Sequence, residues 1–248
     1  MGDMDHWNRF PRPAGIGPWP ESYLRDLEEF FRTEDTRPPG LDIYEDVFQT
    51  HLFFPLQRKR ELEKAVKYVR SQMEPNVVME IGADKGAGFY HWCKCFLAVE
   101  KAIALEVRGC PYANLFEEHF GGSIDFLWCE ASSTAKKTIE SVKTFLGSDT
   151  IDVLFIDGDK NKTREDFEAY APMMTKGGVV MIHDIKDDPP GVTFDALVGQ
   201  YPSERIIDMS ENDEAVERAA SGIPADTSYE DWLRYWAGRS CGVGILRL

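Results

Sequence analysis

The central part of the chain alternates between short apolar runs and longer segments whose apolar residues recur with helical spacing. The short runs are rich in β-branched residues, which favours strands that are buried on both faces of a sheet. These runs are VVMEI (77–81), AIALEV (102–107), IDFLWC (124–129), IDVLFID (151–157) and GVVMIHD (178–184). The pattern therefore predicts a series of buried strands in the middle of the chain.

The segments around these strands predict helices. An amphipathic helix over 56–72, ended by Pro75, is expected before the first strand. Helical patterns in the connections cover 87–99, 111–119, 133–145 and 163–174. Strands that alternate with helices are typical of an α/β fold, in which a parallel sheet carries helices on both faces and binds its ligand beyond the carboxyl ends of the strands.

The two ends of the chain differ from this middle. Residues 1–40 contain six of the fourteen prolines, which predicts a proline-rich arm before a single domain over 41–248. After residue 184 the pattern predicts a helix at 194–198 and two strands that pair with each other, at 205–208 and 242–248. The stretch 211–231 has seven acidic residues and one arginine, so we expect an acidic insertion or loop there.

Composition narrows the class of partner. The chain has 28 basic and 43 acidic residues, a net charge of −15, which disfavours nucleic acid and anionic membrane surfaces. The apolar runs are far shorter than the roughly 18 residues of a membrane span. The N-terminal residues lack the pattern of a signal peptide, and the five cysteines form no CxxC pair, so we expect a cytoplasmic protein with reduced thiols.

The turn after the first predicted strand is rich in glycine and has the sequence EIGADKGAG over 80–88. Glycine lets the backbone approach a ligand, and the following helix presents free N–H groups. The spacing differs from the G-x-G-x-x-G of a pyrophosphate site, and an acid at Glu80 suits a cationic amino group better than a phosphate. Both points argue against an NAD-dependent oxidoreductase. The candidate ligand-binding residues of this turn are Glu80, Gly82, Ala83, Asp84, Gly86 and Gly88.

Acidic residues also mark the ends of the next two predicted strands. Glu106 lies 18 residues after Gly88, where an acidic side chain accepts hydrogen bonds from both hydroxyls of a ribose. Glu130 and the small Ala131 end the third strand, where they are candidates to border an adenine ring. Together these residues predict a nucleoside-binding site.

The acids at successive strand ends, from the 80–88 turn through Glu106 and Glu130 to Asp157, resemble the class I S-adenosylmethionine-dependent methyltransferases over residues 56–248. The resemblance implies S-adenosylmethionine as cofactor, with Asp157 among the residues that bind it. It also implies a Rossmann-like, seven-stranded, mostly parallel sheet with helices on both faces and an antiparallel last strand.

The segments from Ile156 to Lys160, 166–172 and 177–184 resemble the cephalosporin-hydroxylase-like and macrolide-sugar O-methyltransferases, and are similar to the cation-dependent catechol and caffeoyl-CoA O-methyltransferases. This resemblance implies a site for Mg²⁺ or another divalent cation and a lysine base. The positions that match are Asp157, His183 and Asp184 for the metal and Lys160 for the base. Histidine is a poor ligand for a hard cation, so either the metal is softer than Mg²⁺ or His183 is not a ligand.

The expected reaction is methyl transfer to a hydroxyl of a small acceptor, such as a sugar or a phenolic natural product. A metal lowers the hydroxyl pKa while a base takes the proton. Two alternatives stay open at this point: a metal-independent enzyme with His183 as the base, and a non-catalytic module that binds S-adenosylmethionine. The sequence leaves the identity of the acceptor and homo-oligomerisation open.

Overall fold

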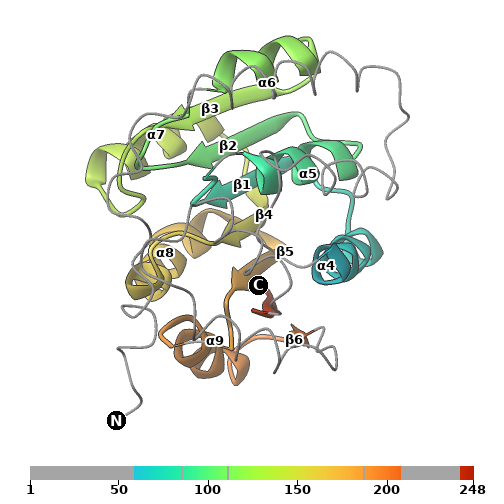
Figure 1. The fold of residues 1–248 in the computed structure, drawn as a ribbon, viewed down its shortest axis with the longest axis vertical. Coiled ribbons are helices and arrows are strands. Elements are labelled where there is room, and N and C mark those ends of the chain that lie inside the picture. The colour runs from blue at the N-terminus through green and yellow to red at the C-terminus, as the bar shows by residue number, and fades with distance from the viewer. Residues whose placement is uncertain (1–58, 85, 111, 187, 208–240) are drawn as a thin grey trace, which may run out of the picture.

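The computed structural model describes residues 59–84, 86–110, 112–186, 188–207 and 241–248. The arm predicted over 1–40 and the acidic segment predicted over 211–231 lie outside these residues. In the described part, one central sheet is covered by helices on both faces (Figure 1). No helix in this part is both long and apolar enough to cross a membrane.

The sheet has seven strands in the order β3-β2-β1-β4-β5-β7-β6. The first five pair in parallel, and β7 pairs antiparallel with both β5 and β6. The mostly parallel sheet with an antiparallel last strand is therefore confirmed. The strands are β1 (Val77–Ile81), β2 (Lys101–Leu105), β3 (Asp125–Cys129), β4 (Ile151–Ile156), β5 (Met174–His183), β6 (Ser203–Ile206) and β7 (Val243–Arg247).

Six α-helices in the described residues cover the sheet, and the strands divide their side chains between two hydrophobic clusters. The first three helices pack on one face with Val78, Val153 and Val179, and the last three pack on the other with Val77, Leu154 and Val180. This division follows from the two-residue period of a strand. The helices are α4 (Lys59–Gln72), α5 (Ala87–Cys95), α6 (Ala113–Phe120), α7 (Lys136–Leu146), α8 (Thr163–Tyr170) and α9 (Pro190–Val198).

Element boundaries differ from the predicted ones where proline or glycine intervenes. The helix expected to run to residue 174 ends at Tyr170, and a 3₁₀ turn with Pro172 in its first positions separates it from β5. Proline lacks an N–H and ends the helical hydrogen bonding. The fifth strand starts at Met174 instead of 178, and Gly177, with a φ of 84°, lies where its pairing with β4 shifts register. The helix α9 starts at Pro190, four residues before the predicted start at 194.

The strand order decides which loops meet. The strand β1 lies between β2 and β4, and β5 lies beside β4. The carboxyl ends of these parallel strands share one edge of the sheet, so the loops that follow them form a continuous surface. The polar residues at 106, 130, 157 and 184 are each the first residue after a strand on this edge.

Candidate active site

The loop after β1 packs directly against the end of β4. Gly82 has a φ of +84°, and a Cβ on it would lie 2.4 Å from the backbone oxygen of Asp157. The Gly82 N–H donates to Leu105 O at 2.8 Å, and the Asp157 N–H donates to Ile81 O at 2.9 Å. Only glycine fits this position, and its presence brings the ends of three neighbouring strands together.

Glu80 is a buried carboxyl group in β1, one residue before the strand ends, with 2% of its surface exposed. A Cβ on Gly88 would lie 2.7 Å from Glu80 Oε1, so the missing side chain at residue 88 leaves room for the carboxyl group. Glu80 Oε2 has no hydrogen-bond partner among the described residues. Burial, and then the negative charge of Asp157, raise the pKa of Glu80 well above its usual value. A buried carboxyl group with unused hydrogen-bonding capacity suits a positively charged ligand group.

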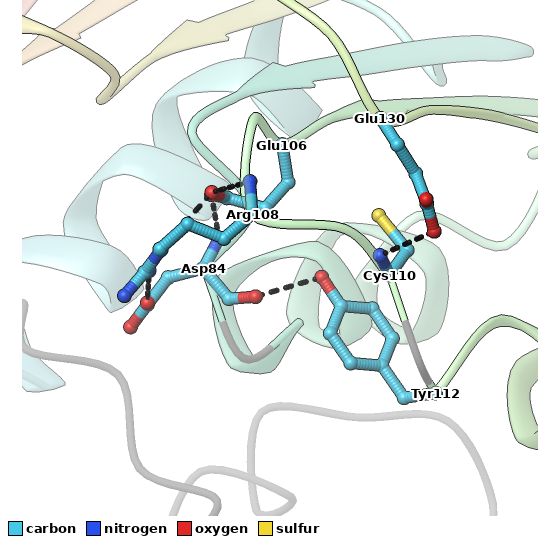
Figure 2. Close-up of polar contacts among 6 residues, drawn as sticks. All are labelled: Asp84, Glu106, Arg108, Cys110, Tyr112 and Glu130. Atoms are coloured by element: carbon cyan, nitrogen blue, oxygen red, sulfur yellow. Dashed lines mark hydrogen bonds and ion pairs between the residues drawn. The ribbon is translucent and has the colours of Figure 1, made fainter. Parts of the chain in front are cut away.

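Glu106 is held in place by a network that Figure 2 shows. Its Oε2 accepts a hydrogen bond from the Asp84 N–H at 2.9 Å, and its Oε1 accepts from the Arg108 backbone N–H at 2.9 Å and Nε at 3.2 Å. Arg108 also forms an ion pair with the Asp84 carboxylate. Burial lowers the pKa of Arg108, but the charges of Asp84 and Glu106 outweigh it and raise that pKa. The network ties the loop after β1 to the loop after β2.

Two further contacts complete this part of the surface. The Tyr112 hydroxyl donates to Asp84 O at 2.9 Å, and the Cys110 N–H donates to Glu130 Oε1 at 3.0 Å (Figure 2). The second contact brings the end of β3, where Ala131 also lies, against the loop after β2. The residues predicted to bind a nucleoside therefore come from two adjacent loops, which the hydrogen bond from Asp84 to Glu106 joins to the loop after β1.

A second cluster lies at the neighbouring ends of β4 and β5. His183 Nδ1 lies 2.9 Å from Asp157 Oδ1 and 3.3 Å from Asp184 Oδ1. The Lys160 Nζ lies 2.6 Å from Asp184 Oδ2. All four residues that the sequence nominated for metal binding or base catalysis are thus in one place.

The charges in this cluster shift the pKa values of two groups. Burial by itself would lower the pKa of His183, but the carboxylates of Asp157 and Asp184 raise it to about 9. Burial opposes the ionisation of Asp184, yet the positive charges of His183 and Lys160 lower its pKa to about 2. The backbone of Asp184 has a φ of 61°, a conformation that residues other than glycine rarely adopt. The carboxylate is thus ionised, and its contacts with Lys160 and His183 hold it in place.

Sequence reasoning missed three residues that lie at these two clusters. Arg108 is close to Glu106 in the sequence, and a basic residue two positions after a ligand-binding acid was a usable signal. Val107 follows Glu106 directly, and 68% of its apolar side chain is exposed. Cys241 lies within reach of His183 and Asp184, although it is 57 positions after Asp184 and no local pattern marks it.

Comparison with known proteins identifies the domain. Residues 79–185 match a family described as a methyltransferase domain. The structure is similar to an O-methyltransferase from Bacillus cereus in complex with S-adenosylhomocysteine, with 9% identity, a TM-score of 0.51 and coverage of 94% of this chain and 93% of that one. It is also similar to a Staphylococcus aureus protein assigned as a caffeoyl-CoA O-methyltransferase, with 13% identity, a TM-score of 0.54 and coverage of 92% and 99%. No curated protein matches the sequence.

The matched segment runs from within β1 to just beyond β5, so it includes Glu80, Glu106, Asp157 and Asp184. At these low identities the two solved structures establish the fold, and the family match establishes the kind of domain. Residues 79–185 therefore match a methyltransferase domain, and the described residues have the fold of the two O-methyltransferases.

Proposed function

We propose that this methyltransferase transfers the methyl group of S-adenosylmethionine to a hydroxyl group of a small molecule, such as a sugar or a phenolic natural product, with the help of a divalent cation. The observation that carries the proposal is the adjacency of two clusters. Buried carboxyl groups on β1 and after β2 lie beside the Asp157–His183–Asp184 cluster at the ends of β4 and β5. A donor bound over the first cluster has the second as its neighbour, which is what methyl transfer to a bound acceptor requires.

The methionine part of the cofactor is assigned to the loop after β1. The amino group of the cofactor is positively charged and is proposed to meet the buried carboxyl group of Glu80. The positive charge of this ammonium group favours the ionised form of Glu80. The loop backbone of Gly82, Ala83, Asp84, Gly86 and Gly88 lies alongside the ligand, and Asp157 closes the site from β4.

The nucleoside part is assigned to the loops after β2 and β3. Glu106 Oε2 accepts only the bond from Asp84 and keeps a lone pair for a ribose hydroxyl, whereas Oε1 already accepts two bonds from Arg108. Val107, exposed beside it, offers an apolar surface to the adenine ring, which Glu130 and Ala131 border on the other side.

The cluster at β4 and β5 contains donors that fit a divalent cation. The separations of 2.9 and 3.3 Å from His183 Nδ1 to the two carboxylates match the spacing of neighbouring ligands around one ion, which is roughly 3 Å when each bond is about 2.1 Å. A cation bound by Asp157, His183 and Asp184 would lower the pKa of the acceptor hydroxyl.

Lys160 is the proposed base: its ammonium group first releases a proton to solvent, and the neutral Nζ then takes the hydroxyl proton. Asp184 positions the amine through the 2.6 Å contact at Oδ2, and Lys160 is 26% exposed, so it can reach an acceptor. His183 is less suited to this role, because as a ligand of the cation its nitrogen lone pair would not be available to a proton. The acceptor oxygen attacks the methyl carbon, the bond from that carbon to sulfur breaks, and S-adenosylhomocysteine leaves with the electron pair on sulfur.

Calorimetric titration with S-adenosylhomocysteine, with and without Mg²⁺ or Mn²⁺, tests the donor site. We expect micromolar binding that Glu80→Ala and Glu106→Ala each weaken at least about tenfold, the loss of one or two charge-assisted hydrogen bonds. The matched control is Glu118→Gln, an exposed acid on α6, which should bind normally. A folded protein that does not bind the ligand under any condition contradicts the proposal.

Transfer of a labelled methyl group to a panel of sugars and phenols tests the chemical step. Asp184→Ala and Lys160→Met should abolish transfer while S-adenosylhomocysteine still binds. If chelators do not affect the transfer, the proposed role of the cation is wrong, whereas the proposed methyl transfer to a hydroxyl is not contradicted.

A further inference from the structure

A third type of donor lies beside His183 and Asp184. The Cys241 Sγ, a carboxylate oxygen of Asp184 and a ring nitrogen of His183 all lie within 4.8 Å of one another, and all three residues are buried. Cys241 lies two residues before β7, whose antiparallel pairing places Val243 opposite His183. The cysteine is therefore brought to the cluster by the register of the sheet.

The imidazole of His183 is oriented as a metal-binding histidine commonly is. Its Nδ1 lies 2.9 Å from Asp157 Oδ1, and its Nε2 is buried with no hydrogen-bond partner among the described residues. A carboxylate that accepts from one ring nitrogen fixes the tautomer and leaves the other nitrogen to the metal. A buried polar atom without a partner is costly, which points to a bound group that would satisfy it.

The carboxylate of Asp184 also faces this cluster, and it has a side-chain hydrogen bond with Cys241. Its Oδ2 pairs with Lys160 Nζ at 2.6 Å, whereas its Oδ1 is 3.3 Å from His183 Nδ1. Lys160 therefore pairs with one oxygen of the carboxylate, and a bound ion would take the place of the thiol proton that joins Cys241 to Asp184. A donor set of nitrogen, oxygen and sulfur does not suit Mg²⁺, which prefers oxygen alone.

We propose that His183, Asp184 and Cys241 bind a thiophilic divalent ion of the Zn²⁺ type, and that Asp157 positions His183 instead of coordinating the ion. This inference rests on the proposed function, which places a cation at the ends of β4 and β5. It replaces Asp157 by Cys241 in the ligand set and Mg²⁺ by a thiophilic metal. Three protein ligands are typical of catalytic zinc sites, which keep one position open for water or substrate. Here that position would receive the acceptor hydroxyl.

Titration of the chelator-treated full chain with Co²⁺ tests the ligand set. Cobalt is a spectroscopic substitute for zinc, and a thiolate ligand produces a charge-transfer band in the near ultraviolet. We expect one equivalent of Co²⁺ to produce this band and Zn²⁺ to remove it, while excess Mg²⁺ leaves it unchanged. The band should be absent in Cys241→Ser and retained in the control Cys129→Ser, which changes a half-buried cysteine outside the cluster.

Second variants separate ligands from positioning residues. His183→Gln should abolish tight Zn²⁺ binding, whereas Asp157→Asn should weaken it only ~10–100-fold and keep the thiolate band. A folded wild-type protein that binds Co²⁺ without a thiolate band, or that binds no Co²⁺ at all, overturns the proposal. Binding of S-adenosylhomocysteine is measured on the same samples, and a variant that still binds it is folded. A wild-type protein that does not bind it would contradict the proposed function, whereas the metal titration would still test the ligand set.

Discussion

Arg108 donates two hydrogen bonds to a single oxygen of Glu106, from its backbone N–H at 2.9 Å and from Nε at 3.2 Å. The other oxygen of Glu106 accepts from the Asp84 N–H at 2.9 Å. The carboxylate assigned to the ribose is therefore fixed before any ligand arrives, and a fixed partner loses less conformational freedom on binding.

The first prediction concerns this positioning. Arg108→Ala should weaken binding of S-adenosylhomocysteine about tenfold, since the charge-assisted bonds that orient Glu106 are lost. Arg108→Lys should recover only part of the affinity, because an ammonium cannot reproduce the guanidinium geometry. Calorimetry gives both values. Tighter binding by Arg108→Ala would mean that Arg108 competes with the ribose for Glu106.

The second prediction separates stability from binding at Glu80. The pKa of this carboxyl is raised in the folded protein, so its contribution to stability is present at low pH and is lost as pH rises above its unfolded value of 4.5. Glu80→Gln should therefore raise the melting temperature at pH 7, by roughly 2–4 °C for each kcal/mol regained. The same change should weaken binding of S-adenosylhomocysteine.

A proton measurement checks the same idea on the unaltered chain. Binding of the ligand's ammonium group should lower the pKa of Glu80 and release protons, which calorimetry detects when the titration is repeated in buffers of different ionisation enthalpy. Glu80→Gln is the control and should remove this proton release. A wild-type protein that releases none would show that the carboxyl group does not meet the ammonium.

The third prediction concerns the close packing of the loop after β1. Gly82 and Gly121 both have positive φ, but a Cβ on Gly82 would lie 2.4 Å from Asp157 O, whereas one on Gly121 would meet nothing within 4 Å. Gly121→Ala should cost about 1–2 kcal/mol of unfolding free energy from backbone strain alone. Gly82→Ala should cost more, by about 1–3 kcal/mol for the added overlap. Urea denaturation of the pair measures the difference, and equal costs would contradict the tight contact between the β1 loop and β4.

The fourth prediction is a pH dependence of stability that comes from His183. The pKa of about 9 in the folded protein exceeds the unfolded value of about 6.5, so the stabilisation is fully present below pH 6.5 and is lost as the pH rises to 9. In chelator-treated protein the unfolding free energy should fall over this interval by at most about 3 kcal/mol. Asp157→Asn and His183→Gln should both flatten the decline, as urea denaturation at each pH would show. A wild-type profile that is flat from pH 6.5 to 9 would show that the histidine is not charged in the fold.

The local sequence was sufficient for most of the elements and for the cofactor side of the site. Apolar runs such as 151–157 predicted strands because side chains buried on both faces leave a short, uninterrupted hydrophobic signal. Glu106 and Asp157 were identifiable because each is an acidic residue in the last two positions of such a run. The errors were at boundaries, for example where Pro172 ends a helix four residues earlier than the periodicity indicated.

The sequence by itself determined the strands, the helices and the acids that follow each strand, because these depend on interactions between near neighbours in the chain. Only the tertiary structure decided that Cys241 joins His183 and Asp184, since the antiparallel pairing of β7 with β5 connects segments about 60 residues apart. It likewise decided that Asp157 is held against His183, because that contact depends on β4 and β5 being neighbours in the sheet. Strand order and register are set by the packing of the whole core, and no local pattern encodes them.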